Sequence, residues 1–300
     1  MTPDESLPKA LLQKLTAAGA PLWYLKAIAQ PRTTRFVTTT DGLKLHCTFW
    51  NESESDKPPL LLVHGYRAHA HAWDPIAPYF TQNFRVLAVD LIGMGQSDRR
   101  ADYAYVTRFA DDLPAVVEGF GLGSVMLVGH SFGGACAIHF AHRRPDLVKR
   151  LVAIDTMVPF PELDQERISM QRGRTEPYPD YDSIISRYRL LPPQPCPAWS
   201  EAYMAHHSVR QVAGGWTWKF DTNLPAGRVE FGTQAALRAL TMPTDFISGE
   251  YSVVCDAQRA RLVEQAIGQG RRTIVIPEAY HHILLDHPLS LVGALRALLA

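Results

Sequence analysis

A strand, a sharp turn and a helix follow one another around Ser131, and this feature limits the fold more than any other. The apolar residues 125–128 are typical of a buried strand, and the small residues that follow Gly133 suit the start of a helix. Between them lies the pattern Gly-x-Ser-x-Gly, in which Gly129 and Gly133 lack the Cβ atoms that would clash in such a turn. The turn exposes the Ser131 hydroxyl above the strand end, so Ser131 is a candidate nucleophile.

Short apolar segments alternate with helical patterns on both sides of this turn. The predicted strands are 60–63, 85–89, 125–128, 150–154, 244–248 and 273–276, and the predicted helices include 73–81, 106–120, a helix ending near 143, 256–267 and 289–299. This alternation predicts a parallel sheet covered on both faces. Two short outer helices are expected within 7–29, and a hairpin is expected around Asp41-Gly42, a pair that suits a type I′ turn.

The alternation stops between Thr156 and about Arg238, where Pro, Tyr, Trp and Arg are frequent. We therefore expect three parts: a core in 1–155 that includes the helices in 7–29, a helical cap in 156–238, and the rest of the core in 239–300. The cap aromatics are expected to pack its helices and together to form an apolar pocket wall; they are Tyr178, Tyr181, Tyr188, Trp199, Tyr203, Trp216, Trp218 and Phe220. Its arginines are most simply a solvated face, although one could bind a substrate carboxylate; they are Arg172, Arg174, Arg187 and Arg189.

The composition favours a large globular protein that acts on a small molecule. The chain has 300 residues, 46% of them hydrophobic, and 30 basic residues balance 30 acidic ones. A balanced charge does not favour nucleic acid or an anionic membrane as a partner, so we expect a small substrate that is not strongly charged. The amino terminus lacks the apolar run of a secretory signal and no segment is long enough to span a bilayer, which predicts a cytoplasmic protein. The cysteines are widely separated, so reduced thiols are expected.

The order of these parts resembles the α/β-hydrolase superfamily over residues 35–155 and 240–300. Four segments carry the resemblance: 61–66 resembles the oxyanion loop, 90–98 the next strand-end loop, 129–133 the nucleophile elbow, and 279–282 with 286–288 the segment of the catalytic histidine. The resemblance implies an α/β-hydrolase fold, with a mostly parallel central sheet flanked by helices and a helical cap inserted after the sixth strand.

The resemblance also assigns roles to individual residues. Ser131 would be the nucleophile, and His281 would take its proton. We choose His281 over His282 because the histidine of the family usually stands seven positions before a proline, which is Pro288 here. The backbone N–H groups of Tyr66 and Phe132 would form the oxyanion hole.

The acid departs from the common family pattern. Most members carry an aspartate after the strand that follows the cap, but residues 249–254 contain none. Asp155, at the end of the strand after the elbow helix, is the expected partner of His281, with Glu250 as second choice and Asp256 as third. Asp90 and Asp98 are expected to hold loops in place.

These residues predict a cofactor-free serine esterase that cleaves an ester, thioester or lactone of a small, largely apolar acyl or aromatic substrate. Two alternatives stay open: a carbon–carbon bond hydrolase with the same triad, and a ligand sensor without turnover. A serine at the elbow weighs against epoxide hydrolase and dehalogenase chemistry, which needs an aspartate there. No metal site is expected, because His64, His69 and His71 lack the further spaced ligands of a zinc site. The sequence leaves a homodimer open.

Overall fold

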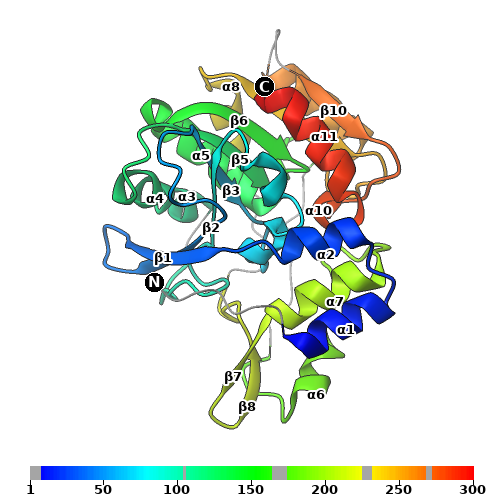
Figure 1. The fold of residues 1–300 in the computed structure, drawn as a ribbon. Coiled ribbons are helices and arrows are strands. Elements are labelled where there is room, and N and C mark those ends of the chain that lie inside the picture. The colour runs from blue at the N-terminus through cyan, green and yellow to red at the C-terminus, as the bar shows by residue number, and fades with distance from the viewer. Residues whose placement is uncertain (1–7, 104–105, 164–173, 225–231, 268–271) are drawn as a thin grey trace.

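An eight-stranded sheet forms the centre of the computed structural model, which describes residues 8–103, 106–163, 174–224, 232–267 and 272–300 (Figure 1). The strands lie in the order β1-β2-β4-β3-β5-β6-β9-β10. Their bounds are β1 Thr33–Thr38, β2 Lys44–Phe49, β3 Pro59–Val63, β4 Arg85–Val89, β5 Val125–His130, β6 Val148–Ile154, β9 Thr244–Gly249 and β10 Thr273–Ile276. From β4 to β10 all pairs are parallel, whereas β2 is antiparallel to both of its neighbours. The predicted mostly parallel sheet is confirmed.

Helices cover both faces of the sheet. They are α1 Lys9–Ala17, α2 Leu22–Ile28, α3 Val106–Ala110, α4 Leu113–Gly119, α5 Phe132–Arg143, α6 Tyr181–Ile185, α7 Ala198–His207, α8 Gly232–Arg238, α9 Ala257–Ile267, α10 Ile283–Asp286 and α11 Pro288–Leu299, with 3₁₀ turns η1 Ala70–Trp73, η2 Ala77–Phe80 and η3 Pro145–Leu147. Strand β3 shows why both faces of the sheet must be buried, because its apolar side chains point alternately to one face and to the other. Leu61 and Val63 join one core with residues of α3, α4, α5, α8 and α9, and Leu60 and Leu62 join the other with α1, α2, α10 and α11.

Prolines explain two departures from the predicted helices. The predicted helix 73–81 does not form: η1 ends at Trp73 and η2 covers Ala77–Phe80, because Pro75 and Pro78 lack the N–H groups that an α-helix needs. The predicted helix 106–120 is divided into α3 and α4. Pro114 lies four residues after Ala110, where α3 ends, and its ring would clash with the Ala110 carbonyl of a continuous helix.

The first hairpin forms with a wider loop than predicted. Thr38 pairs with Lys44, so five residues rather than two connect β1 and β2. The Thr39 hydroxyl accepts the Leu43 N–H at 3.0 Å and donates to Asp41 at 2.6 Å, and Gly42 takes the positive φ of 85°. The type I′ prediction is therefore wrong, because the Thr39 side chain closes the loop instead.

The segment between β6 and β9 contains a hairpin in addition to helices. Strands β7 Val209–Val212 and β8 Gly215–Trp218 pair across Ala213-Gly214, and Figure 1 places this hairpin with α6 and α7 away from the central sheet, with α1 beside α7. Ile184, Val209 and Trp218 form a small core of their own. Helix α8 packs against α5 of the main core, where the His139 ring and the Thr233 hydroxyl lie 3.0 Å apart. Segments 164–173 and 225–231 of the predicted cap lie outside the described residues.

No helix among the described residues is long and apolar enough to cross a membrane.

Candidate active site

Ser131 occupies a strained turn between β5 and α5. Its φ of 55° and ψ of −121° are unusual for a residue with a side chain, and its N–H donates to the Ile154 carbonyl at 2.8 Å. Gly133 permits this turn, since a Cβ there would lie 2.2 Å from the His64 carbonyl oxygen. A Cβ on Gly129 would lie 2.6 Å from the Gly133 carbonyl oxygen. Both glycines of the pattern are therefore required sterically.

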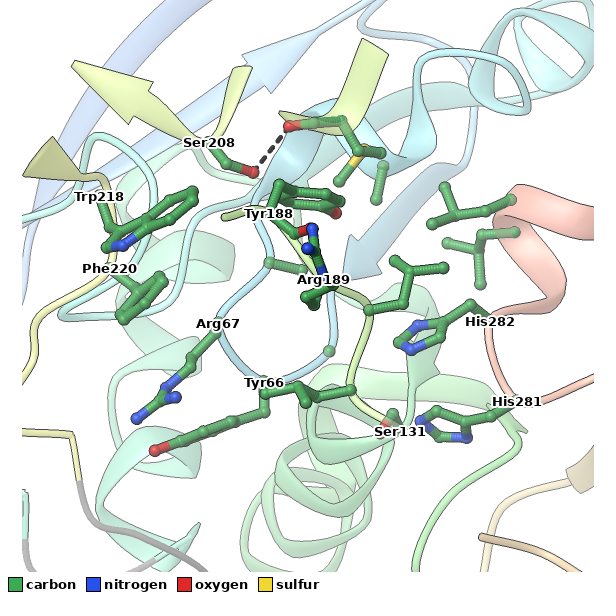
Figure 2. Close-up of a pocket in the computed structure, with 18 of the residues that line it drawn as sticks. Tyr66, Arg67, Ser131, Tyr188, Arg189, Ser208, Trp218, Phe220, His281 and His282 are labelled. Atoms are coloured by element: carbon green, nitrogen blue, oxygen red, sulfur yellow. Dashed lines mark hydrogen bonds between the residues drawn. The ribbon is translucent and has the colours of Figure 1, made fainter. Parts of the chain in front are cut away.

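A buried histidine–aspartate pair lies beside this turn. His281 Nδ1 and Asp155 Oδ1 are 2.7 Å apart, and both side chains are almost completely buried. Asp155 also accepts the Gly249 N–H at 2.8 Å and the Ser252 hydroxyl at 2.6 Å. These three donors fix the carboxylate, and Figure 2 shows His281 next to Ser131. The segments that follow the carboxyl ends of β5, β6 and β10 thus bring Ser131, Asp155 and His281 together.

The alternative acids lie in other hydrogen bonds. Glu250 is exposed, and its carboxylate accepts the Glu278 N–H at 2.9 Å. Asp256 accepts the Arg259 N–H at 2.8 Å, at the start of α9. In the place where most family members carry the acid, Ser252 donates to Asp155 instead. Ser252 was not among the predicted site residues, because its only signal in the sequence is its position in the segment that lacks an aspartate.

The loop after β3 lies against the serine turn, on the side predicted for the oxyanion hole. A Cβ on Gly65 would lie 3.3 Å from the Ser131 Cβ, so the two segments are in contact. The next residue, Tyr66, packs its ring edge-on against the Phe132 ring at 5.5 Å between centroids. Phe132 is the first residue of α5, and an N–H in the first turn of a helix has no acceptor within that helix. The backbones of Tyr66 and Phe132 therefore flank Ser131.

Asp90, directly after β4, and Asp98, in the loop that follows, hold loops in place, as predicted. Asp90 accepts hydrogen bonds from the Ala70 and Gln96 backbone and lies 2.9 Å from His46 Nδ1. Although burial opposes ionisation, the hydrogen bond from His46 holds the pKa of Asp90 well below its usual range. Asp98 accepts the Lys44 N–H at 2.8 Å.

Three imidazoles meet at the serine turn. Ring nitrogens of His130, His281 and His282 lie within 4.8 Å of one another, which is close enough for a metal ion to bind after small shifts. Burial lowers the pKa of His282 to about 3 and that of His130 well below its ordinary value, so both rings are neutral at neutral pH.

His64, His69 and His71, the histidines first weighed as metal ligands, each make hydrogen bonds to other residues. His64 bonds to the Gly65 carbonyl and the Leu91 N–H, His69 to Ser208, and His71 to Asp74.

A cavity of about 280 Å³ opens in front of Ser131 (Figure 2). Apolar side chains form much of its wall; they include Leu190, Leu191, Met204, Leu284 and Leu285. Of the cap aromatics, Tyr178, Tyr188, Trp218 and Phe220 line the cavity. The others pack the scaffold: Trp199 and Tyr203 contact Tyr24 of α2, and Tyr181 contacts Trp216. Arg174, Arg187 and Arg189 also line the cavity, as does Arg67, whereas Arg172 lies outside the described residues.

A parallel sheet that carries a serine turn and a histidine loop to the same edge is the arrangement of the α/β hydrolases, and the chain belongs to this family. The family model, described as the alpha/beta hydrolase fold, matches residues 58–288. The chain is similar to the esterase Rv0045c of Mycobacterium tuberculosis, with 27% identity over 250 residues that cover 81% of this chain and 83% of the relative.

Solved structures share the same fold. The crystal structure of that M. tuberculosis esterase matches with a TM-score of 0.70 and 23% identity, covering 100% of this chain and 99% of the other. The structure of E-2-(acetamidomethylene)succinate hydrolase matches with a TM-score of 0.73 and 21% identity, covering 89% of this chain and 99% of that one.

Proposed function

We propose that this protein is a serine esterase in which Ser131 attacks an ester carbonyl and forms an acyl-enzyme. One observation carries the proposal: the buried pair of His281 and Asp155, 2.7 Å apart, lies beside a serine in a strained strand-to-helix turn. A serine hydroxyl is a weak nucleophile at neutral pH unless a base takes its proton. Because Asp155 accepts the Nδ1–H of His281, the other ring nitrogen keeps a lone pair for the Ser131 proton.

The reaction then follows two steps that this geometry supports. Ser131 Oγ bonds to the carbonyl carbon as its proton moves to His281 Nε2. The N–H groups of Tyr66 and Phe132 stabilise the oxyanion, and each donor increases the rate roughly a hundredfold. The carbon–oxygen bond of the ester breaks, and the alcohol leaves with the proton from His281. A water molecule next gives its proton to His281 and attacks the acyl-enzyme, which releases the acid and restores Ser131.

The substrate class follows from the cavity and from the relatives. A cavity of about 280 Å³ with leucine and aromatic walls suits a small acyl group that is apolar over most of its length. The similarity to an esterase favours an ester over other acyl compounds, although a thioester or lactone would react by the same steps. Ser131 cannot form the alkyl-ester intermediate that epoxide hydrolases and dehalogenases make on an aspartate.

The test is hydrolysis of p-nitrophenyl esters from acetate to long acyl chains, measured for the wild type and for Ser131→Ala. We expect turnover of short and medium esters that is lost in Ser131→Ala, because the nucleophile is removed. Labelling of Ser131 by a fluorophosphonate provides a second measure that needs no turnover. Labelling without ester hydrolysis would contradict the esterase proposal and favour carbon–carbon cleavage, and absence of both would favour a ligand sensor.

A further inference from the structure

The residues that line the cavity have a net positive charge, whereas the chain as a whole has none. Four arginines and no aspartate or glutamate line it among the described residues; the arginines are Arg67, Arg174, Arg187 and Arg189. Across the chain, by contrast, 30 basic residues balance 30 acidic ones. One of these arginines, Arg174, lies 3.7 Å from the carboxylate of the exposed Glu176. Positive charge is therefore concentrated at a pocket whose remaining walls are largely apolar.

Arg67 is the arginine whose position is most firmly set. It follows Tyr66 in the loop beside the serine turn and has a φ of 55°, an uncommon conformation for a residue with a side chain. Its guanidinium carbon lies 4.8 Å from the centre of the Phe220 ring and 5.3 Å from that of Tyr66. Two aromatic contacts hold the planar group and remove water from its faces, and N–H groups at its edge are suited to a carboxylate.

Arg67 lies where it could bind a negative charge on the substrate that is distant from the ester bond. Figure 2 shows Arg67 and Phe220 on the opposite side of the pocket from Ser131 and His281. A substrate with its carbonyl at Ser131 and an apolar middle section would place a distal anion at this guanidinium. The other three arginines, Arg174, Arg187 and Arg189, are exposed to solvent, where they would attract anions toward the pocket.

We propose that the pocket selects substrates that carry a carboxylate remote from the ester, with Arg67 as the residue that binds it. This inference rests on the proposed esterase function and narrows the substrate from a small apolar ester to one with an anionic end. The carboxylate could belong to the acyl part, as in a monoester of a dicarboxylic acid, or to the alcohol part. The recognition chemistry is the same in both cases.

The experiment compares charged and neutral esters of matched shape. In the acyl arm, kcat/KM is measured for p-nitrophenyl monoglutarate and for the corresponding glutaramic acid ester, in which an amide replaces the carboxylate. In the alcohol arm, 4-acetoxybenzoate is compared with its primary amide. Wild type should prefer the acid by roughly ten- to a hundredfold in one arm, the range expected for a charge-assisted bidentate pair. The arm that shows the preference identifies which part of the substrate holds the anion.

Variants then test the role of Arg67. Arg67→Gln should reduce the acid-to-amide ratio to near one, and Arg67→Lys should leave an intermediate ratio because it keeps the charge and loses the planar fork. Arg261→Gln removes an exposed charge on α9 that does not line the pocket, so it should keep the wild-type ratio. A wild-type ratio of one or less in both arms, or a ratio that persists in Arg67→Gln, would overturn the proposal.

A measurement without turnover separates this inference from the proposed function. Glutarate or benzoate should slow fluorophosphonate labelling of Ser131 in the wild type, whereas glutaramide and benzamide should not, and Arg67→Gln should remove the difference. If neutral esters are hydrolysed by Ser131 but no anion preference is found, only the present inference fails. If no ester is hydrolysed although carboxylates protect Ser131, the esterase proposal fails and the anion site stands.

Discussion

The Asp155 carboxylate receives hydrogen bonds from three donors in two segments: the Gly249 N–H and the Ser252 hydroxyl after β9, and the His281 ring. We predict that Asp155→Asn lowers kcat by a factor on the order of 10⁴, the effect known for this change in a serine protease triad. The reason is that an amide cannot accept from all three donors, so the substituted side chain would turn an N–H toward one of them and disturb the orientation of His281. The measurement is kcat for p-nitrophenyl butyrate, with circular dichroism as a check on folding.

Glu250→Gln is the matched control for this change. Within the described residues, the exposed carboxylate of Glu250 accepts a hydrogen bond from the Glu278 N–H and makes none to His281. We therefore expect kcat of the variant to stay close to that of the wild type. Equal losses in the two variants, or a loss confined to Glu250→Gln, would show that Asp155 is not the residue that orients His281.

The sequence alone supported some of these residues much better than others. Ser131 and His281 were predicted because local patterns mark them: the glycines around one, and the spacing to Pro288 for the other. Asp155 was predicted by its place at a strand end, and the structure puts it against His281. Ser252 and Arg67 were not assigned a role, because their significance depends on contacts with residues far away in the sequence. Such contacts have no local signature.

Close approach between the end of β3 and the start of α5 makes the serine turn depend on Gly133. A Cβ at this position would lie 2.2 Å and 2.7 Å from the carbonyl oxygens of His64 and Val63, which belong to the backbone and cannot move aside easily. We predict that Gly133→Ala destabilises the protein by about 1–3 kcal/mol through overpacking. Urea unfolding at neutral pH measures the free energy of unfolding.

Gly293→Ala is the control for this prediction, since Gly293 lies exposed in α11 with nothing within 4 Å of a new Cβ. Alanine is the better helix former, so this variant should gain roughly 0.5–1 kcal/mol. Opposite signs for the two substitutions are the expected result. A stabilised Gly133→Ala variant would contradict the steric argument for the turn.

At the level of elements, strands were easier to predict than helices. Parallel strands buried on both faces consist of continuous apolar runs, and β3, β4 and β5 were therefore predicted close to their observed bounds. The errors have local causes that the periodicity does not report. Prolines divided 73–81 and 106–120, and the β7–β8 hairpin was missed although Gly214 follows Ala213 at a two-residue turn. Hydrophobic periodicity identifies which face is buried more reliably than it identifies where a helix ends.

Across the whole molecule, many histidines are held in their neutral form. Burial is the first cause of a lowered pKa for His64, His69, His130, His139, His206, His207 and His282. In the unfolded chain a histidine has a pKa near 6.5, so below this pH the unfolded state binds more protons than the folded state. The free energy of unfolding is therefore not reduced by these histidines above about pH 6.5, and it falls as the pH drops toward their pKa values in the folded protein.

His139 offers the cleanest test of this linkage, because it lies in α5 beneath α8, away from the serine turn, and its pKa is lowered to about 4 by burial. Between pH 6 and 5 the unfolded state takes up a proton at this position and the folded state does not. We predict that His139→Gln reduces the loss of unfolding free energy over this interval by roughly 1 kcal/mol per pH unit relative to the wild type. Glutamine keeps a polar partner for the Thr233 hydroxyl.

Urea unfolding of both proteins at intervals from pH 5 to 8 measures this difference. The interval from pH 5 to 6 isolates histidines, since carboxylates in the unfolded chain titrate nearer pH 4. Above about pH 7 neither state of His139 binds a proton, so the two stability curves should run parallel there, whatever constant offset the substitution introduces. Parallel curves down to pH 5 would mean that His139 is protonated in the folded protein and that its burial does not set its charge. A difference confined to the acid limb would instead mean that burial of neutral imidazole limits the acid stability of the fold.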